Sequence, residues 1–244
     1  MTPDPRRRLA GAALLFVLAA IAAGCFNPFD PRISRQGGVS TPPPAPTSPE
    51  GVLRLFEWCW NNRAIDQYRE IFTDDYRFYF AVNDTAGNIF RDRPWLREDE
   101  MASTTNLFQG GSVHPPASRI SLQFAQNLRA FPDSRPNKAF PWHQQINTTV
   151  VLEVTTDEES YQVTGSALYR LTRGDSAEIP EELRARGFRP DSTRWYIEQW
   201  EDQTQQTGPG PNAAGSGAHG VRPERAAAVP RPATWGLIKA TYRR

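Results

Sequence analysis

The residues of this chain whose types could do chemistry are carboxylates, tyrosines and histidines. Asp74 and Asp75 stand where a predicted helix gives way to a predicted strand. A carboxylate at such a junction can face a pocket and abstract a proton, with the hydroxyl of Tyr79 or Tyr169 as hydrogen-bond donor. The alternative is that one aspartate turns the chain and the other is solvated. The sequence favours this second interpretation.

Two further carboxylates and the histidines add no clear catalytic group. Glu153 and Glu198 lie on predicted strands and have the same two interpretations as the aspartates. His114 precedes a Pro-Pro turn, His143 stands near the start of a strand, and His219 falls in a low-complexity segment. None has a second His, Cys or carboxylate at metal-ligand spacing, so the sequence predicts no metal site and no cofactor.

The motifs of other functional classes are missing from the sequence. No serine stands in the G-x-S-x-G setting of a serine hydrolase. The stretches QGGS and GSG lack the lysine and the strand-turn-helix context of a phosphate loop. The net charge is +1 with acidic and basic residues interspersed, which argues against a nucleic-acid partner. We therefore predict no catalytic residues and a protein that is not an enzyme.

Aromatic side chains offer a candidate ligand site. Six tryptophans invite a carbohydrate or apolar-ligand interpretation, namely Trp58, Trp60, Trp142, Trp195, Trp200 and Trp235. Core packing also explains them and is favoured. A pocket lined by some of the aromatic residues is still the best ligand-site hypothesis. Its candidate lining is Tyr79, Trp142, His143, Tyr169 and Trp195, and it would take a small apolar ligand.

The stretch LLFVLAAIAAGCFNPFDP, residues 14–31, indicates where the protein is sent. Arginines at positions 6–8 precede an apolar run from Leu9 to Ala23, which is the order of a secretory signal. A spanning helix needs about 20 apolar residues, and this run is shorter and is followed by Asn27 and not by a cluster of charges. We expect residues 1–24 to be a cleaved signal peptide.

Residues 21–25, IAAGC, resemble the lipobox of bacterial lipoproteins, in which small residues precede a cysteine that is acylated and becomes the new N-terminus. The resemblance implies that Cys25 carries the lipid and ties the protein to a membrane. The family prefers leucine where this chain has Ala22. Ala20 and Ala22 also form an A-x-A site, whose use would leave a soluble periplasmic protein with a free Cys25 thiol. Phe26, in place of an aspartate, favours the outer membrane, facing the periplasm.

The rest of the chain divides into a spacer and one domain. Residues 25–46 are rich in proline without apolar periodicity, which predicts a disordered tether. Residues 47–244 suffice for one domain with a hydrophobic core. Within it, residues 203–233 are expected to form a disordered loop and residues 234–242 to dock as a terminal strand. Cys59, the other cysteine, is interpreted as a buried apolar residue on a helix.

Periodicity and capping residues predict helices first and strands afterwards. Helices are expected from residue 47 or 48 to the NNR of residues 61–63, over 65–72, and from residue 94 or 95 to 108. Alternating apolar residues predict the strands 73–82, 118–126, 142–156, 160–173 and 192–202. This order is that of an α+β domain and not of parallel βαβ units.

The stretch SPEGVLRLFEWCWNNRAIDQYREIFTDDYRFYF, residues 48–80, is similar to the N-terminal part of NTF2-like (SnoaL-like) domains, and the element order over residues 47–202 resembles theirs. The resemblance implies a cone in which three helices of the N-terminal half pack on a curved antiparallel sheet. Some members are isomerases, dehydratases or cyclases, while others bind ligands or proteins and catalyse nothing. The ending WGLIKATYR resembles that of lipid-anchored members known only as uncharacterised bacterial lipoproteins.

Three functions fit these observations. The first is a lipid-anchored cell-envelope protein with a non-catalytic NTF2-like domain that binds a small ligand or an envelope protein. The second is an isomerase or hydratase that uses a pocket carboxylate of the same cone. The third is a structural or assembly lipoprotein without a ligand pocket. A deep cone with a buried, perturbed Asp or His would favour the enzyme, and a cone filled by aromatic side chains would favour the third function.

Overall fold

The computed structural model describes residues 41–82, 84, 90, 93–204 and 230–243. The chain divides into two units, Met1–Pro42 and Pro43–Arg244, and nearly all described residues belong to the second. The predicted signal peptide, Cys25, His219, and most of the predicted tether and loop lie outside the described residues. Among the helices that are described, none has both the length and the apolar character needed to cross a membrane.

The described residues follow the α+β order predicted from the sequence. The helices are α2 (Pro49–Asn62), α3 (Ile65–Arg69), α4 (Arg97–Gln109), α5 (Glu181–Ala185) and α6 (Trp235–Tyr242). The strands are β1 (Phe72–Tyr79), β2 (Trp95–Leu96), β3 (Arg119–Phe124), β4 (Phe131–Pro132), β5 (His143–Thr155), β6 (Ser160–Arg173), β7 (Trp195–Asp202) and β8 (Arg231–Ala233). The predicted helices of the N-terminal half are therefore confirmed as α2, α3 and α4.

The first helix shows how local sequence sets an element's ends. The Ser48 hydroxyl accepts a hydrogen bond from the Gly51 N–H at 2.9 Å, which caps α2, and Pro49 occupies the first turn. Arg63 ends the helix in a left-handed conformation. Cys59 is buried in this helix, as predicted. Pro46, before the helix, already belongs to the domain because its carbonyl accepts a hydrogen bond from the Trp195 N–H.

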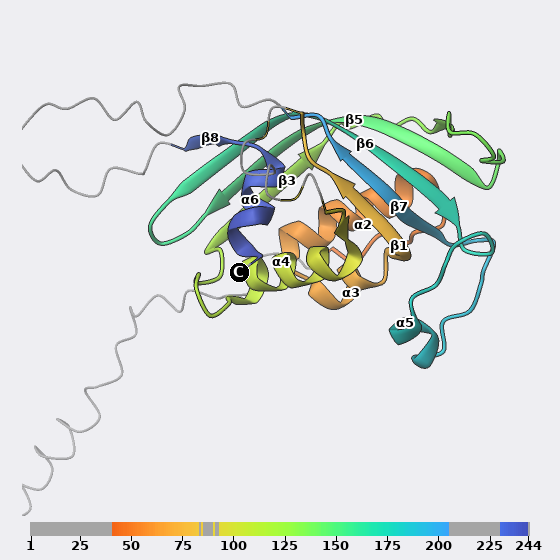
Figure 1. The fold of residues 1–244 in the computed structure, drawn as a ribbon, viewed down its shortest axis with the longest axis horizontal. Coiled ribbons are helices and arrows are strands. Elements are labelled where there is room, and N and C mark those ends of the chain that lie inside the picture. Colours follow the sequence, from red (N-terminus) through yellow and green to blue (C-terminus); the bar gives the residue numbers. More distant parts are fainter. Residues whose placement is uncertain (1–40, 83, 85–89, 91–92, 205–229, 244) are drawn as a thin grey trace, which may run out of the picture. The chain divides into compact units, whose positions relative to one another are not determined.

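The strands form one sheet in the order β2-β1-β7-β6-β5-β3, with β4 paired to β5 and β8 paired to β6. Most neighbours are antiparallel, while β1 with β7 and β6 with β8 are parallel. Figure 1 shows the sheet curving over α2, α3 and α4, which lie on its concave side. This arrangement confirms the predicted α+β class and the predicted cone, in which three helices of the N-terminal half pack on a curved sheet.

The C-terminal segment differs from its prediction. We expected a strand over residues 234–242, and the structure has the helix α6 there, preceded by the short strand β8. The Thr234 hydroxyl caps α6 by accepting a hydrogen bond from the Leu237 N–H at 3.0 Å. Trp235, Ile238 and Tyr242 recur at helical spacing and are buried on one face of the helix. The prediction that residues 203–233 form a disordered loop is also wrong for residues 231–233, because these form β8 and pair with β6.

Aromatic side chains fill the space between the helices and the sheet. Phe56 of α2 is completely buried at the centre of this cluster. Its ring centroid lies within 6.3 Å of the centroids of Trp60, Tyr68, Phe72, Phe124, Tyr169, Trp200 and Trp235. Core packing is thereby confirmed for the buried tryptophans Trp60, Trp195, Trp200 and Trp235. The interior of the cone is thus lined, and largely occupied, by rings.

Candidate functional site

A carboxylate, Glu100, is buried inside the cone. It lies in the first turn of α4, whose N-terminus is fixed by the Asp99 carboxylate accepting a hydrogen bond from the Leu96 N–H at 3.2 Å. The Glu100 side chain is completely buried. A buried carboxylate is costly unless it is paired or hydrogen-bonded. The surroundings of Glu100 therefore determine what the interior can do.

Neutral donors surround this carboxylate. Its Oε1 accepts hydrogen bonds from the Tyr68 hydroxyl at 2.7 Å and the Thr104 hydroxyl at 3.2 Å. Its Oε2 accepts from the Trp95 indole N–H at 3.1 Å and the Tyr76 hydroxyl at 3.4 Å. Burial and the Glu100 charge raise the pKa of both tyrosines well above 10, so both hydroxyls keep their protons and act as donors.

The cationic partner of Glu100 comes from α6. Lys239 is 1% exposed, and its Nζ donates to both carboxylate oxygens of Glu100. The same Nζ lies 4.1 Å from the ring centroid of Trp200 and 4.7 Å from that of Phe78. Burial lowers the pKa of Lys239 to about 8, and the Glu100 charge opposes this effect. We call the residues that contact Nζ, together with those that donate to the Glu100 carboxylate, the Lys239 cage; they are Tyr68, Tyr76, Phe78, Trp95, Glu100, Thr104 and Trp200.

Two more buried carboxylates hold the N-terminal end of α6. The Asp84 carboxylate accepts a hydrogen bond from the Thr234 hydroxyl at 2.8 Å. The Asp202 carboxylate accepts from the Gly236 N–H at 3.2 Å and from the Thr204 hydroxyl at 2.6 Å. Burial, with a contribution from the Asp84 charge, raises the pKa of Asp202 from 3.8 to about 6. Asp202 is therefore, with Lys239, a buried group whose pKa is shifted from its ordinary value.

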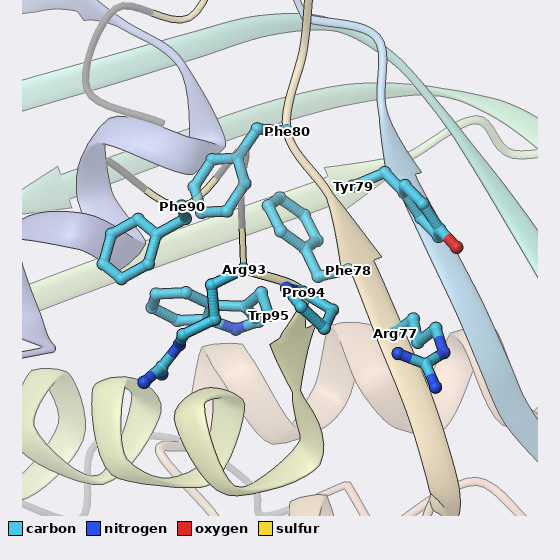
Figure 2. Close-up of a pocket in the computed structure, with 8 residues that line it drawn as sticks. All are labelled: Arg77, Phe78, Tyr79, Phe80, Phe90, Arg93, Pro94 and Trp95. Carbon is cyan, nitrogen blue, oxygen red and sulfur yellow. The ribbon is translucent and has the colours of Figure 1, made fainter. Parts of the chain in front are cut away.

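An open pocket adjoins the cage beside the end of β1 and shares Phe78 and Trp95 with it (Figure 2). Its volume is about 300 Å³, and its lining is Arg77, Phe78, Tyr79, Phe80, Phe90, Arg93, Pro94 and Trp95. The rings of Phe80 and Phe90 stack with centroids 5.5 Å apart and meet Trp95 edge-on. Arg93 pairs with the Asp99 carboxylate. We call this the β1 pocket, and its chemistry suits an aromatic or apolar group.

The structure separates Tyr79 and Tyr169, which we expected in one pocket. Tyr79 is 47% exposed and lines the β1 pocket. Tyr169 lies on β6 in the core, where its ring stacks on Trp200 at 5.3 Å. Burial, the Asp202 charge and the Glu100 charge raise the pKa of Tyr169 well above 10. Tyr169 therefore contributes packing next to the Lys239 cage.

The other predicted pocket residues gather at a different end of the sheet. The Arg173 guanidinium lies 4.8 Å from the ring centroid of Trp142 and 5.8 Å from that of Trp195. His143 is the first residue of β5, and its Nδ1 lies 3.3 Å from the Ala139 carbonyl oxygen. Trp142 and Trp195 are thus brought together, but with a cation between them.

The acidic residues singled out from the sequence are not part of the Lys239 cage. Asp74 and Asp75 are exposed on β1. Glu198 of β7 accepts hydrogen bonds from Arg135 at 2.9 Å and Lys138 at 2.7 Å. Burial alone would raise the pKa of Glu198, but these two cations lower it. Among the described residues, no group of three His, Cys, Asp or Glu side chains could hold a metal ion.

Sequence reasoning missed the residues that the interior brings together. Glu100 stands in the first turn of a helix, where an acidic residue is already favoured by the helix dipole, so its position does not by itself point to the interior. Lys239, one of the chain's two lysines, stands in an apolar segment, and that placement was the one available signal. A lysine on the buried face of a docked segment needs an acidic partner.

No family model matches the chain, and no curated protein matches it. Some solved structures resemble it at low sequence identity. A conserved protein from Planctomyces limnophilus is 11% identical with a TM-score of 0.43, over 64% of this chain and 92% of that one. An NTF2-like superfamily protein from Salmonella enterica is 12% identical with a TM-score of 0.38, over 68% and 92%.

The beta subunit of the benzoate 1,2-dioxygenase from Burkholderia mallei is 13% identical with a TM-score of 0.39, over 62% of this chain and 85% of that one. Because these TM-scores lie below 0.5, the likenesses say nothing about what this chain binds or does. Its function has to come from its own residues.

Proposed function

We propose that this chain is a lipid-anchored protein of the bacterial cell envelope, in the outer membrane and facing the periplasm, whose folded domain works by binding and not by catalysis. The anchor is supported by the lipobox-like sequence that ends at Cys25. The absence of catalysis is supported by the Glu100–Lys239 pair inside the cone, and binding is supported by the β1 pocket. The ligand is a small molecule or an envelope protein.

The observation that carries this proposal is the pairing of Glu100 with Lys239. A general base needs a free carboxylate within reach of a substrate proton. Both oxygens of Glu100 already accept hydrogen bonds from Lys239 and from neutral donors, and both residues of the pair are buried. Glu100 is therefore engaged within the chain and leaves no carboxylate oxygen free for a substrate proton.

A structural or assembly role is the second candidate function. It is favoured by the aromatic cluster around Phe56, which occupies the space where a ligand-binding cone would be hollow. The binding proposal is preferred because the β1 pocket offers an aromatic site of about 300 Å³ outside that cluster.

The enzyme alternative is supported by two buried groups with perturbed pKa values, Asp202 and Lys239. Asp202 is hydrogen-bonded to Thr204 and to the backbone of α6, and Lys239 is paired with Glu100. Neither group is among the residues that line the β1 pocket. The enzyme alternative is therefore less well supported than the binding role.

The anchor is tested by labelling cells with a fatty acid that carries an alkyne and by separating membranes from soluble proteins. Wild type and Cys59→Ala are expected to carry the label and to sediment with membranes, whereas Cys25→Ala is expected to lose the label. Cys59→Ala is the matched control because these are the chain's two cysteines. A free Cys25 thiol on a soluble protein would overturn the anchor.

The binding role is tested by native mass spectrometry of the full chain purified from membranes in detergent. We expect a noncovalent ligand or a protein partner that is lost on unfolding. Two results together would contradict binding and favour the assembly role. The purified chain would carry no bound species, and cells that lack the protein would have a mechanically weaker envelope.

A further inference from the structure

We propose that the Lys239 cage is a binding site for a primary ammonium group, and that Lys239 is its resident and replaceable occupant. The inference rests on the binding function proposed above and names the chemical class of one ligand. Every cage residue comes from α3, β1, β2, α4 or β7, whereas the cation alone comes from α6. The cage and its occupant thus belong to different parts of the fold.

The cage has the chemistry of an ammonium site. Glu100 supplies two acceptor oxygens, and the rings of Trp200 and Phe78 present their π faces to the same Nζ. A carboxylate and aromatic faces together favour a cation, because each lowers the energy of a positive charge taken out of water. The N–H groups of a primary ammonium matter as well, because both oxygens of Glu100 accept hydrogen bonds from it and a quaternary ammonium has no N–H to donate.

The neutral donors of the cage cannot replace that cation. Without Lys239, the Glu100 carboxylate would keep its bonds to Tyr68, Thr104 and Trp95 but would be buried without a countercharge. An uncompensated buried charge is strongly destabilising, so a cage without its occupant favours uptake of another ammonium. A neutral molecule of the same size gains no such stabilisation.

The backbone of α6 is held by contacts that do not involve Nζ. The Ser103 hydroxyl donates to the Lys239 carbonyl oxygen at 2.9 Å, and the Asn106 amide donates to the Tyr242 carbonyl oxygen at 2.9 Å. Arg243 donates to Asp99 at 2.7 Å. These bonds, with Asp84 and Asp202 at the other end of α6, keep the helix docked when the side chain of residue 239 is shortened.

The shape of the vacated space follows from the substitution. Lys239→Ala removes three methylene groups and the amine, which together have the composition of propylammonium. The space would be walled by Trp200 and Phe78 and would end at Glu100. Propylammonium is therefore the probe, and 1-propanol is its neutral counterpart of similar size.

The experiment measures the thermal unfolding of the full chain in detergent, as Lys239→Ala, with increasing propylammonium chloride. Controls are 1-propanol, sodium chloride at the same ionic strength, and the variant Lys138→Ala. Lys138 is the chain's other lysine and pairs with Glu198 near the surface, so it is a matched control. We expect a saturable rise in Tm of roughly 3–6 °C at ten times Kd in Lys239→Ala alone.

A second measurement uses the wild-type chain, in case Lys239→Ala does not fold. Propylammonium is expected to compete with Lys239 for Glu100 and to move the NMR signals of the isotope-labelled Lys239 side chain towards those of a solvent-exposed lysine, while sodium chloride has no such effect. Equal responses to propylammonium and 1-propanol, or no response in either measurement, would overturn the ammonium site. Because neither readout depends on lipidation or on a ligand in the β1 pocket, that failure would leave the proposed anchor and binding role standing.

Discussion

Lys239 and Glu100 form an ion pair in which the Nζ of Lys239 donates to both carboxylate oxygens of Glu100, with the two residues 1% and 0% exposed. They stand 139 positions apart in the chain. The pair joins the last helix of the fold to the first turn of α4. It therefore couples docking of α6 to the polarity of the cone interior.

Breaking this pair from one side is expected to lower the free energy of unfolding by about 3–5 kcal/mol, because the remaining charge stays buried without its partner. Lys239→Met and Glu100→Gln test this separately in urea unfolding. The double variant is expected to regain most of the loss, since no lone charge is left. Lys138→Met, which opens the more exposed pair with Glu198, is expected to cost less than about 1 kcal/mol. Equal losses at the two lysines would show that the buried pair is not formed.

The two lysines are also expected to differ in reactivity. Lys138 is about a quarter exposed, whereas the amine of Lys239 is enclosed by the cage. Acetic anhydride at neutral pH should acetylate Lys138 quickly and Lys239 only when α6 undocks or the chain unfolds. Peptide mapping by mass spectrometry after timed labelling measures both sites in one sample. Comparable labelling of the two amines in the folded chain would contradict the enclosed position of Lys239.

Local sequence patterns account for most of the fold. The cap at Ser48, the apolar stripe of α2 and the alternating residues of β5 and β6 each act within a few residues, so periodicity predicts those elements. The C-terminal segment was misassigned because Trp235 and Leu237 suggest alternation, while Trp235, Ile238 and Tyr242 fit a helix equally well. Docking on the cone, which is a long-range interaction, decides between the two patterns.

The interior polar groups could not be predicted in the same way. The inward direction of Glu100 depends on how α4 is rotated against the sheet, and its partner Lys239 is remote in the chain. The predicted pocket residues failed to gather for a related reason. Tyr79 and Tyr169 lie on β1 and β6, and β7 separates these two strands in the sheet. Strand order and facing are set by tertiary packing, which residue types alone do not reveal.

Gly236 is expected to be required for docking of α6. A Cβ at this position would lie 1.9 Å from Asp84 Oδ2 and 2.5 Å from a ring carbon of Phe80. Helix propensity alone would make Gly236→Ala stabilising by about 1 kcal/mol. We expect the opposite sign, a loss of about 1–3 kcal/mol from overpacking, together with faster hydrogen exchange of the α6 amides. A more stable Gly236→Ala variant would contradict the close contact with Asp84.

The stability of the domain is expected to depend on pH through Asp202. Its pKa is raised from 3.8 to about 6 in the folded chain, mainly by burial, so the folded state binds this proton more tightly than the unfolded state does. The stabilising contribution is therefore fully present below pH 3.8 and is lost as the pH rises through about 6. A shift of this size corresponds to roughly 3 kcal/mol.

The measurement is the free energy of unfolding of wild type and Asp202→Asn between pH 4 and pH 7. Asparagine does not titrate and keeps one acceptor oxygen, for Thr204, while it loses the one that accepts from the Gly236 N–H. That loss does not depend on pH, so the change with pH of the difference between the two chains isolates the carboxyl group. Wild type is expected to lose stability relative to Asp202→Asn as the pH rises over this range. Parallel curves for the two chains would show that Asp202 titrates near its ordinary pKa. Burial of Asp202, with the Asp84 charge beside it, would then not be enough to raise its pKa.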